Sequence, residues 1–99
     1  MRMLMKIPIP TDAGNSAIGD GSLPETLKSV LGALRAEAAY FIAADGMRTG
    51  LIFFDMKDST DIPSAAEPLF MRLNARITMV PAMNAEDMQA GIERAMAAA

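Results

Sequence analysis

The feature of the sequence that most restricts the fold is Asp45-Gly46, which opens the short connection between two apolar, strand-like runs, residues 38–44 and 51–56. A tight hairpin needs positive φ angles at its turn, and an Asp-Gly pair supplies them at low steric cost. The two runs are therefore predicted to be antiparallel neighbours in one sheet.

Two other segments, residues 3–9 and 76–82, alternate in character with a period of two. This period is typical of a strand whose two faces meet different surroundings. Pro81 places the end of the second segment at a sheet edge, because proline cannot donate to a neighbouring strand. Residues 11–21 are polar and glycine-rich, and they are predicted to be a connection with room for a short helical turn at 15–18.

Three segments carry apolar residues at helical spacing. They lie within residues 22–35, 61–73 and 84–96. Ser22 and Glu25 fit a capping box at the start of the first helix, and Asn84 is expected to cap the third. Pro68 lies inside the second helix, where it removes a backbone hydrogen bond, so a kink or a break is predicted there.

Composition narrows the class of protein. The chain has 99 residues, which suits a single domain covering residues 1–99. A hydrophobic fraction of 52% excludes a disordered chain. The net charge is −3 and the basic residues are scattered, so nucleic acid is not an expected partner. Neither a membrane span nor the apolar core of a signal peptide is present, so no membrane partner and a cytoplasmic location are expected.

Histidine and cysteine are both absent from the sequence. Their absence excludes thiolate metal sites, disulfides and a thiol nucleophile, and it removes the commonest general base and metal ligand. The aspartates are not spaced as in a calcium loop. We therefore expect no metal and no cofactor, and any catalysis would use Asp, Glu, Lys, Tyr or a borrowed cofactor.

The order of the expected elements, β-α-β-β-α-β-α, predicts an α+β, ferredoxin-like fold with a four-stranded antiparallel sheet. The helices would cover one sheet face, and a slip of one residue would exchange the two faces. One assignment puts a mixed, mainly apolar set on the uncovered face: Leu4, Lys6, Pro8, Ala38, Tyr40, Ile42, Leu51, Phe53, Asp55, Arg76, Thr78 and Val80. An exposed patch of this kind usually marks an interface, and two-fold pairing is the commonest symmetry, so a homodimer is predicted.

Several short segments also give the chain a resemblance to a known group. They are Lys6–Thr11, Ala39–Phe41, Gly46–Gly50, Phe54–Met56 and Ala66–Pro68. Together with the order of elements, they resemble a family of small uncharacterised bacterial proteins similar to the dimeric α+β barrel superfamily, which includes antibiotic-biosynthesis-type monooxygenases and muconolactone-isomerase-like enzymes. The resemblance implies the ferredoxin-like fold, two sheets packed face to face, and a cavity between sheet and helices. It implies no activity, because the His and Trp that many of those enzymes use are missing.

Side chains on the uncovered face are candidates for binding a small anionic or phenolic ligand. Lys6 or Arg76 would supply charge and Tyr40 a hydroxyl, with Asp55 and Thr78 nearby. The alternative is that the two cations extend into solvent while Asp55 pairs with one of them.

Two further residues have an ordinary and a functional interpretation. Glu67 lies beside Pro68, and helix irregularities often accompany sites. Buried under the sheet, Glu67 could serve as a base, whereas exposed it would be an ordinary helical side chain. Arg48, beside the hairpin turn, could bind an anion or be a solvated turn charge.

Three functions remain open from the sequence. The first is a homodimeric small-molecule-binding domain with no chemistry of its own, which the absence of histidine favours. The second is a cofactor-independent, oxygenase- or isomerase-like enzyme acting on a hydrophobic or aromatic metabolite. The third is a structural subunit whose open face is consumed by the dimer contact.

Overall fold

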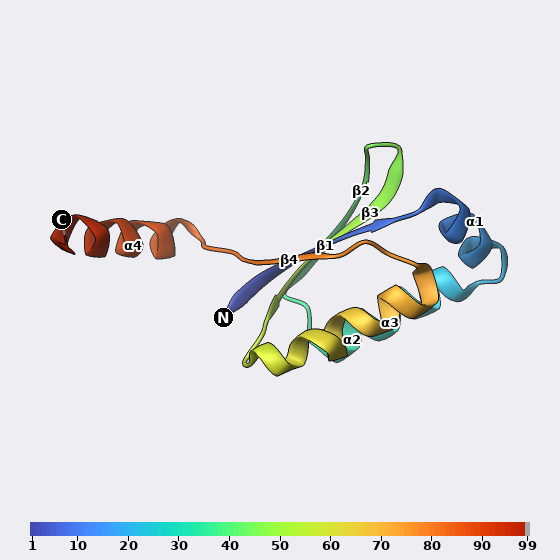
Figure 1. The fold of residues 1–99 in the computed structure, drawn as a ribbon, viewed down its shortest axis with the longest axis horizontal. Helices are drawn as coiled ribbons and strands as arrows, with labels where there is room; N and C mark the ends of the chain where they lie inside the picture. Colours follow the sequence, from blue (N-terminus) through green and yellow to red (C-terminus); the bar gives the residue numbers. More distant parts are fainter. Residues whose placement is uncertain (99) are drawn as a thin grey trace.

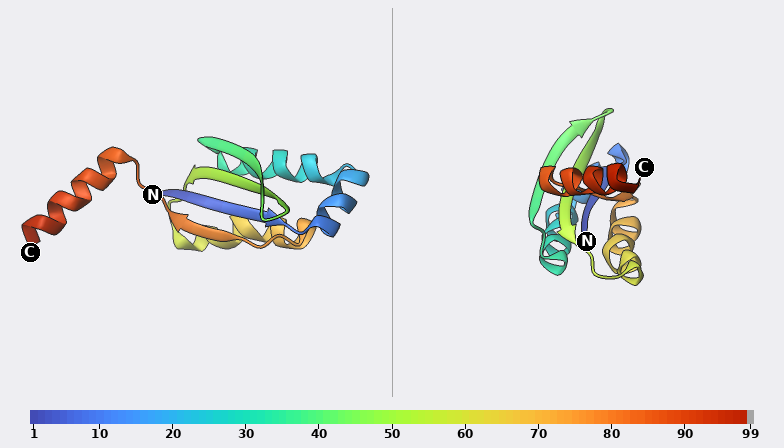
Figure 2. Two further views of the ribbon diagram at one scale, coloured as in Figure 1. Left: turned by 90° about the horizontal axis from the view of Figure 1, so that it is seen from above. Right: turned by 90° about the vertical axis from the view of Figure 1, so that its left-hand side faces the viewer.

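The computed structural model describes residues 1–98 as four strands and four α-helices. In chain order the elements are β1 (Arg2–Ile9), α1 (Thr11–Gly19), α2 (Ser22–Leu34), β2 (Ala38–Ala44), β3 (Met47–Asp55), the short 3-10 helix η1 (Ser59–Asp61), α3 (Ile62–Leu73), β4 (Thr78–Pro81) and α4 (Ala85–Ala98). The strands form one antiparallel sheet in the order β2-β3-β1-β4. Helices α2 and α3 lie side by side on one face of it (Figures 1 and 2). The α+β class and the antiparallel sheet are therefore as predicted, and the strand order is compatible with a ferredoxin-like arrangement.

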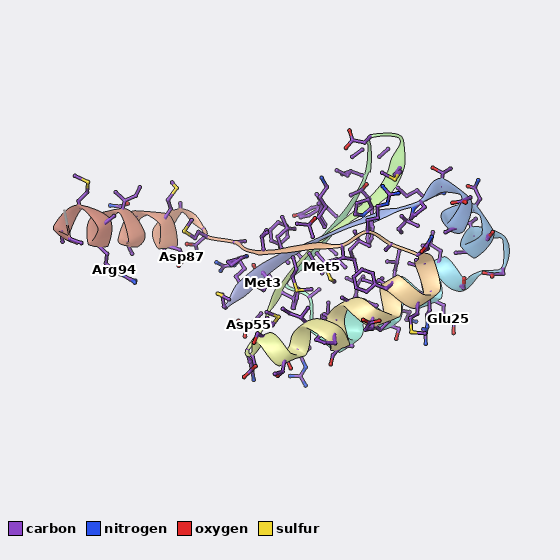
Figure 3. The ribbon with its side chains drawn as sticks, in the orientation of Figure 1. Met3, Met5, Glu25, Asp55, Asp87 and Arg94 are labelled. Carbon is purple, nitrogen blue, oxygen red and sulfur yellow. The ribbon has the colours of Figure 1, made fainter. Side chains whose placement is uncertain are left out.

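The pairing register separates the two faces of the sheet. Met5 lies opposite Ile52 on β3 and Met79 on β4, so these three side chains share the face that the helices cover. The side chains with no solvent exposure at all come from this face and from α3: Met5, Ile7, Ile52, Leu69 and Leu73. The period-two alternation thus places the core between the sheet and the α2–α3 layer (Figure 3).

The hairpin between β2 and β3 has the geometry that its sequence predicts. Asp45 and Gly46 both adopt positive φ, at 53° and 76°, as a two-residue turn between twisted strands requires. Strand β3 begins at Met47, earlier than the apolar run suggests, and so Arg48 lies inside the strand instead of in the turn.

Helix α1 is longer than the short turn predicted for this region, and the expected element order lacked it. Its nine residues begin after Pro10. Only Gly14 and Ala17 are buried in it, and such small residues give no apolar stripe in the sequence. The helix packs against α2 and reaches the hairpin, where the Thr11 hydroxyl donates to the Gly46 carbonyl at 3.4 Å.

The capping box predicted for α2 is wrong. Ser22 is the first helical residue, and Gly21 holds the N-cap position with φ 79° and no side-chain cap. Asp20 instead accepts a hydrogen bond from the Ser22 amide at 2.8 Å, and its bonds with Ser22 lower the pKa of Asp20. The predicted end of α2 is confirmed, since Arg35 is its C-cap.

Pro68 does not break α3, which continues from Ile62 to Leu73. Proline removes the backbone donor that would reach the Ser64 carbonyl. Ser64 is exposed, so water can substitute for that bond at low cost. Of the two predicted alternatives, the break is therefore wrong, and the kink stays a prediction.

Helix α4 extends away from the sheet and gives the molecule a longest dimension of 55 Å (Figures 1 and 2). The Asn84 side chain accepts from the Asp87 amide at 2.8 Å, and the Asp87 carboxylate accepts from the Asn84 amide at 3.1 Å. The predicted Asn84 cap is thus confirmed. Within residues 1–98, neither α4 nor any other helix is long and apolar enough to cross a membrane.

Candidate functional site

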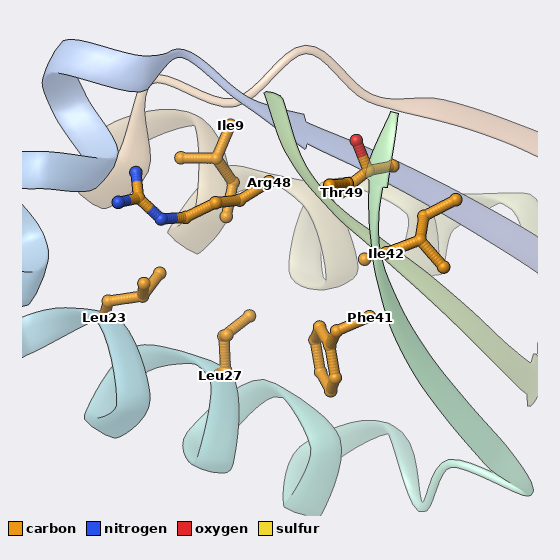
Figure 4. Close-up of a pocket in the computed structure, with 9 residues that line it drawn as sticks. Ile9, Leu23, Leu27, Phe41, Ile42, Arg48 and Thr49 are labelled. Carbon is orange, nitrogen blue, oxygen red and sulfur yellow. The ribbon is translucent and has the colours of Figure 1, made fainter. Parts of the chain in front are cut away.

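An apolar cleft of about 380 Å³ lies between α2 and the β2–β3 hairpin (Figure 4). Its lining residues come from β1, α2, β2 and β3: Ile9, Leu23, Leu27, Phe41, Ile42, Ala43, Arg48, Thr49 and Gly50. Leu23 and Leu27 face the sheet from α2, and the Phe41 ring faces them from β2 (Figure 4). The volume is within the range of small-molecule sites, about 300–1,000 Å³.

The cleft exists because β2 is poorly covered. The β2 side chains Phe41 and Ala43 point to the helix side, since they lie opposite Gly50 and Arg48 in the register, yet both are exposed. Helix α2 makes few contacts with β3. The space left between α2 and the curled hairpin is the cleft.

Arg48 is the charged residue of the cleft. Its guanidinium donates to the Asn15 side-chain oxygen at 3.0 Å, and its side chain is half-buried. No carboxylate among residues 1–98 forms an ion pair with it. The neighbouring Thr49 hydroxyl is occupied, because it donates to the Met47 carbonyl at 3.2 Å. Arg48 therefore places a guanidinium that has no ion-pair partner at the α1 end of the apolar cleft.

Two glycines lie beside residues of the cleft. A Cβ atom at Gly14 would lie 2.7 Å from Arg48 Nη1, so the absence of a side chain in α1 gives the guanidinium its place. Gly14 uses the missing side chain for close approach, since its φ is not positive. A Cβ at Gly50 would lie 3.4 Å from the Phe41 ring, and this distance is an ordinary van der Waals contact.

Replacing Gly14 with alanine is expected to displace the Arg48 guanidinium without unfolding the domain. Alanine favours a helix by about 0.5–1 kcal/mol over glycine, which offsets the cost of moving a flexible side-chain end. Affinity for an apolar carboxylate such as octanoate should fall about fivefold, equivalent to about 1 kcal/mol. Isothermal titration calorimetry measures this change. Gly32→Ala is the matched control, because nothing lies within 4 Å of its Cβ position; an equal loss of affinity in both variants would contradict the role of Gly14.

The register places Lys6, Tyr40, Asp55 and Thr78 on one sheet face, opposite the helices. We call this the open face. Lys6 lies between Leu51 and Thr78, and Tyr40 lies on the other side of Leu51. Lys6, Tyr40 and Thr78 thus form one row across the sheet. All three are exposed, and none lines the cleft.

Arg76 and Asp55 lie at opposite ends of the open face. The Arg76 amide donates to the Pro8 carbonyl at 3.0 Å, beyond one end of the Lys6 row. Asp55 lies opposite Arg2 at the other end. Asp55 is therefore not brought together with Lys6 and Tyr40, whereas Arg76 is a diagonal neighbour of Lys6. The binding role of the set stays a prediction.

The Asp55 carboxylate is paired with the chain's own ammonium group, not with Lys6 or Arg76. It accepts from the Met1 amino group at 2.7 Å, and this bond holds the pKa of Asp55 below its ordinary value. A polar hollow at this end of the sheet contains Asp55, Arg2, Glu37 and Asp87. Arg2 bonds both Glu37 and Asp87, at 3.1 and 2.9 Å, so the charges in this hollow satisfy one another.

Glu67 is exposed on α3, on the helix side of the sheet. Of the two alternatives, an exposed helical side chain is therefore correct, and the prediction that Glu67 is buried under the sheet is wrong. Within the part of the chain that the structure describes, no three acidic residues are grouped so that they could hold a metal ion.

The comparisons with known proteins identify no related family, protein or structure. No protein-family model matches the sequence. No curated protein and no solved structure shows a significant match to the chain.

Proposed function

We propose that the protein is a small-molecule-binding domain that acts as a homodimer, and that its ligand is a compact apolar molecule with one anionic group. The observation that carries this proposal is the half-buried Arg48, free of carboxylate partners, at an apolar cleft of about 380 Å³. A guanidinium recognises a carboxylate or phosphate through parallel N–H donors. In Arg48 the bond to Asn15 uses one nitrogen, and the other N–H groups can still donate to a ligand.

The lining of the cleft favours binding over catalysis. Arg48 is the one lining residue whose polar side chain lies on the helix side of the sheet, because the register turns Thr49 to the open face. Arginine does not lose its proton in proteins, so it cannot exchange protons with a substrate. The Thr49 hydroxyl points away from the cleft and donates to the Met47 carbonyl, so it is not placed to act as a nucleophile there. An acid–base enzyme of the oxygenase or isomerase type would need a group that this cleft does not offer.

The order of strands supports the finer fold proposal. With α1 set aside, the chain runs β1-α2-β2-β3-α3-β4, and the two central strands of the sheet are β1 and β3. Two β-α-β halves that interleave in this way are the ferredoxin-like motif. We propose that the binding domain has this topology and that a second copy covers its open face.

The test compares two probes of the same shape, octanoate and octan-1-ol, by calorimetry with the full chain at neutral pH. Both should bind, because the cleft walls are apolar. Octanoate should bind about ten- to a hundredfold more tightly, since only it can accept charged hydrogen bonds. Equal affinities, or no binding of either probe, would overturn the proposal.

Filling the cleft should abolish binding of both probes. Ala43 lies on the helix side of β2 and lines the cleft. Ala43→Leu adds bulk there, and leucine is well tolerated in a strand, so both affinities should fall by about tenfold or more. Ala44→Leu is the matched control, because the next residue of the same strand points to the open face. Unchanged binding in the Ala43 variant would place the ligand elsewhere.

A further inference from the structure

Two surfaces of the chain lack a covering partner within residues 1–98. The first is the open face, where Tyr40 and Val80 are 61% and 42% exposed and Leu4, Leu51 and Phe53 are partly exposed. The second is one side of α4, where Met88, Ile92 and Met96 are 52%, 54% and 70% exposed. The spacing of these three residues, i, i+4 and i+8, puts them in one stripe.

Helix α4 needs a surface to pack against. Its 14 residues include no buried residue, and a helix of this length is marginal in water without packing. Gly91 lies in its interior and lowers its helix propensity further. The methionines and the isoleucine of the stripe would be solvent-exposed in a lone chain.

The start of α4 is fixed in a direction that leads away from its own sheet. Arg2 holds Asp87 at 2.9 Å, and the Asn84–Asp87 cap fixes the first turn. The Ala82 amide donates to the Arg2 carbonyl at 3.0 Å, so the preceding segment continues the line of β4. Figure 2 shows the helix leaving the end of the sheet. In this direction α4 buries none of its residues on its own open face.

We infer that α4 of each protomer lies across the open face of a second copy. Its 14 residues span about 21 Å, and the eight residues of β1 span about 26 Å, so the helix fits within the length of the sheet. The exchange is reciprocal, as two-fold symmetry requires. It names the contact within the proposed homodimer and does not depend on the ligand of the cleft.

Charge favours the helix over a direct contact of two sheets. Lys6 and Arg76 on the open face form no ion pair among residues 1–98. Two open faces in direct contact would bury these cations from both copies, with only the already paired Asp55 to offset them. Helix α4 carries acidic residues in excess: Glu86, Asp87 and Glu93 against Arg94. Glu93 follows Ile92 of the apolar stripe, so it can pair with a cation of the partner's open face.

The chain has no cysteine, which allows a direct test of which surfaces meet. Full chains carrying Ile92→Cys are mixed with full chains carrying Leu51→Cys and treated with a short bismaleimide cross-linker. The cross-linked product should join one chain of each kind. Lys28→Cys on α2 replaces Leu51→Cys in the matched control and should give at least about tenfold less product. Links only between two Leu51→Cys chains, or no mixed product at all, would overturn the proposal. A second experiment uses a chain that carries both cysteines, and a cross-link formed only within that chain would also overturn it.

Substitutions on the two sides of α4 test the same contact through the dimer dissociation constant, which sedimentation measures. The wild-type chain is expected to sediment as a dimer at micromolar concentration. Ile92→Glu should raise the dimer dissociation constant about a hundredfold or more, because each dimer contains the contact twice. Ala90→Glu puts the same residue on the opposite side of the helix and should leave the constant within about threefold. A monomeric wild-type chain, or equal effects of the two variants, would contradict the exchange. Loss of octanoate binding alone would not, since the cleft is on the other side of the sheet.

Discussion

Arg48→Gln is expected to weaken octanoate binding about ten- to a hundredfold and to leave octan-1-ol binding unchanged. A hydrogen bond to a charged group contributes about 1.5–3 kcal/mol, and only octanoate presents a charged acceptor. Glutamine keeps much of the side chain's length and polarity but removes the positive charge. Calorimetric titration of both probes into the wild-type and variant chains gives the two ratios.

The control for this prediction is Arg72→Gln. Arg72 is an exposed arginine in the last turn of α3 and does not line the cleft. It changes the net charge of the protein by the same amount, so it separates a local contact from a general electrostatic attraction. A loss of octanoate affinity of the same size in both variants would contradict a specific role of Arg48.

Phe54→Ala is expected to lower the free energy of unfolding by about 3–5 kcal/mol, a large part of the about 5–15 kcal/mol typical of a domain. Phe54 is 2% exposed and belongs to the core between the sheet and the helices. Its removal leaves a cavity that the surrounding side chains cannot fill completely. Urea denaturation followed by circular dichroism measures the change.

Phe53→Ala makes the matched comparison for Phe54, because the adjacent phenylalanine points to the open face and is partly exposed. In dilute solution its truncation should cost less than half as much. Its cost should rise with protein concentration, since the proposed dimer buries that face. Equal and concentration-independent losses in the two variants would contradict the assignment of the faces.

The sequence predicts the sheet well and the first helix poorly. Alternation in residues 3–9 and the Asp45-Gly46 turn depend on local chemistry, and both are confirmed by the pairing of β1, β2 and β3. The period of two separates the two faces of each strand, but which face the helices cover cannot be predicted from it, because a slip of one residue exchanges the faces. For helix α1 the sequence predicts only a short turn at 15–18, because its buried residues, Gly14 and Ala17, leave no pattern of large apolar residues.

The candidate site could be predicted only in part. The place of Arg48 beside the turn indicates a possible anion ligand, but it does not predict a cleft around this residue. The cleft depends on the curl of the hairpin away from α2, and on Gly14, which is far from Arg48 in sequence and leaves room for its guanidinium. These are properties of tertiary packing. A close approach between Gly14 and Arg48 has no signal in a single sequence.

The most direct test of the central claim is a titration of the ¹⁵N-labelled full chain with octanoate, followed by NMR spectra of the backbone amides and of the arginine Nε–H groups. We expect chemical-shift changes concentrated at the amides of Leu27, Ala43 and Gly50 and at the Nε–H of Arg48. The backbone amides of the open-face residues Lys6 and Leu51 should change little. Shifts confined to the open face, or no shifts at millimolar octanoate, would contradict that claim.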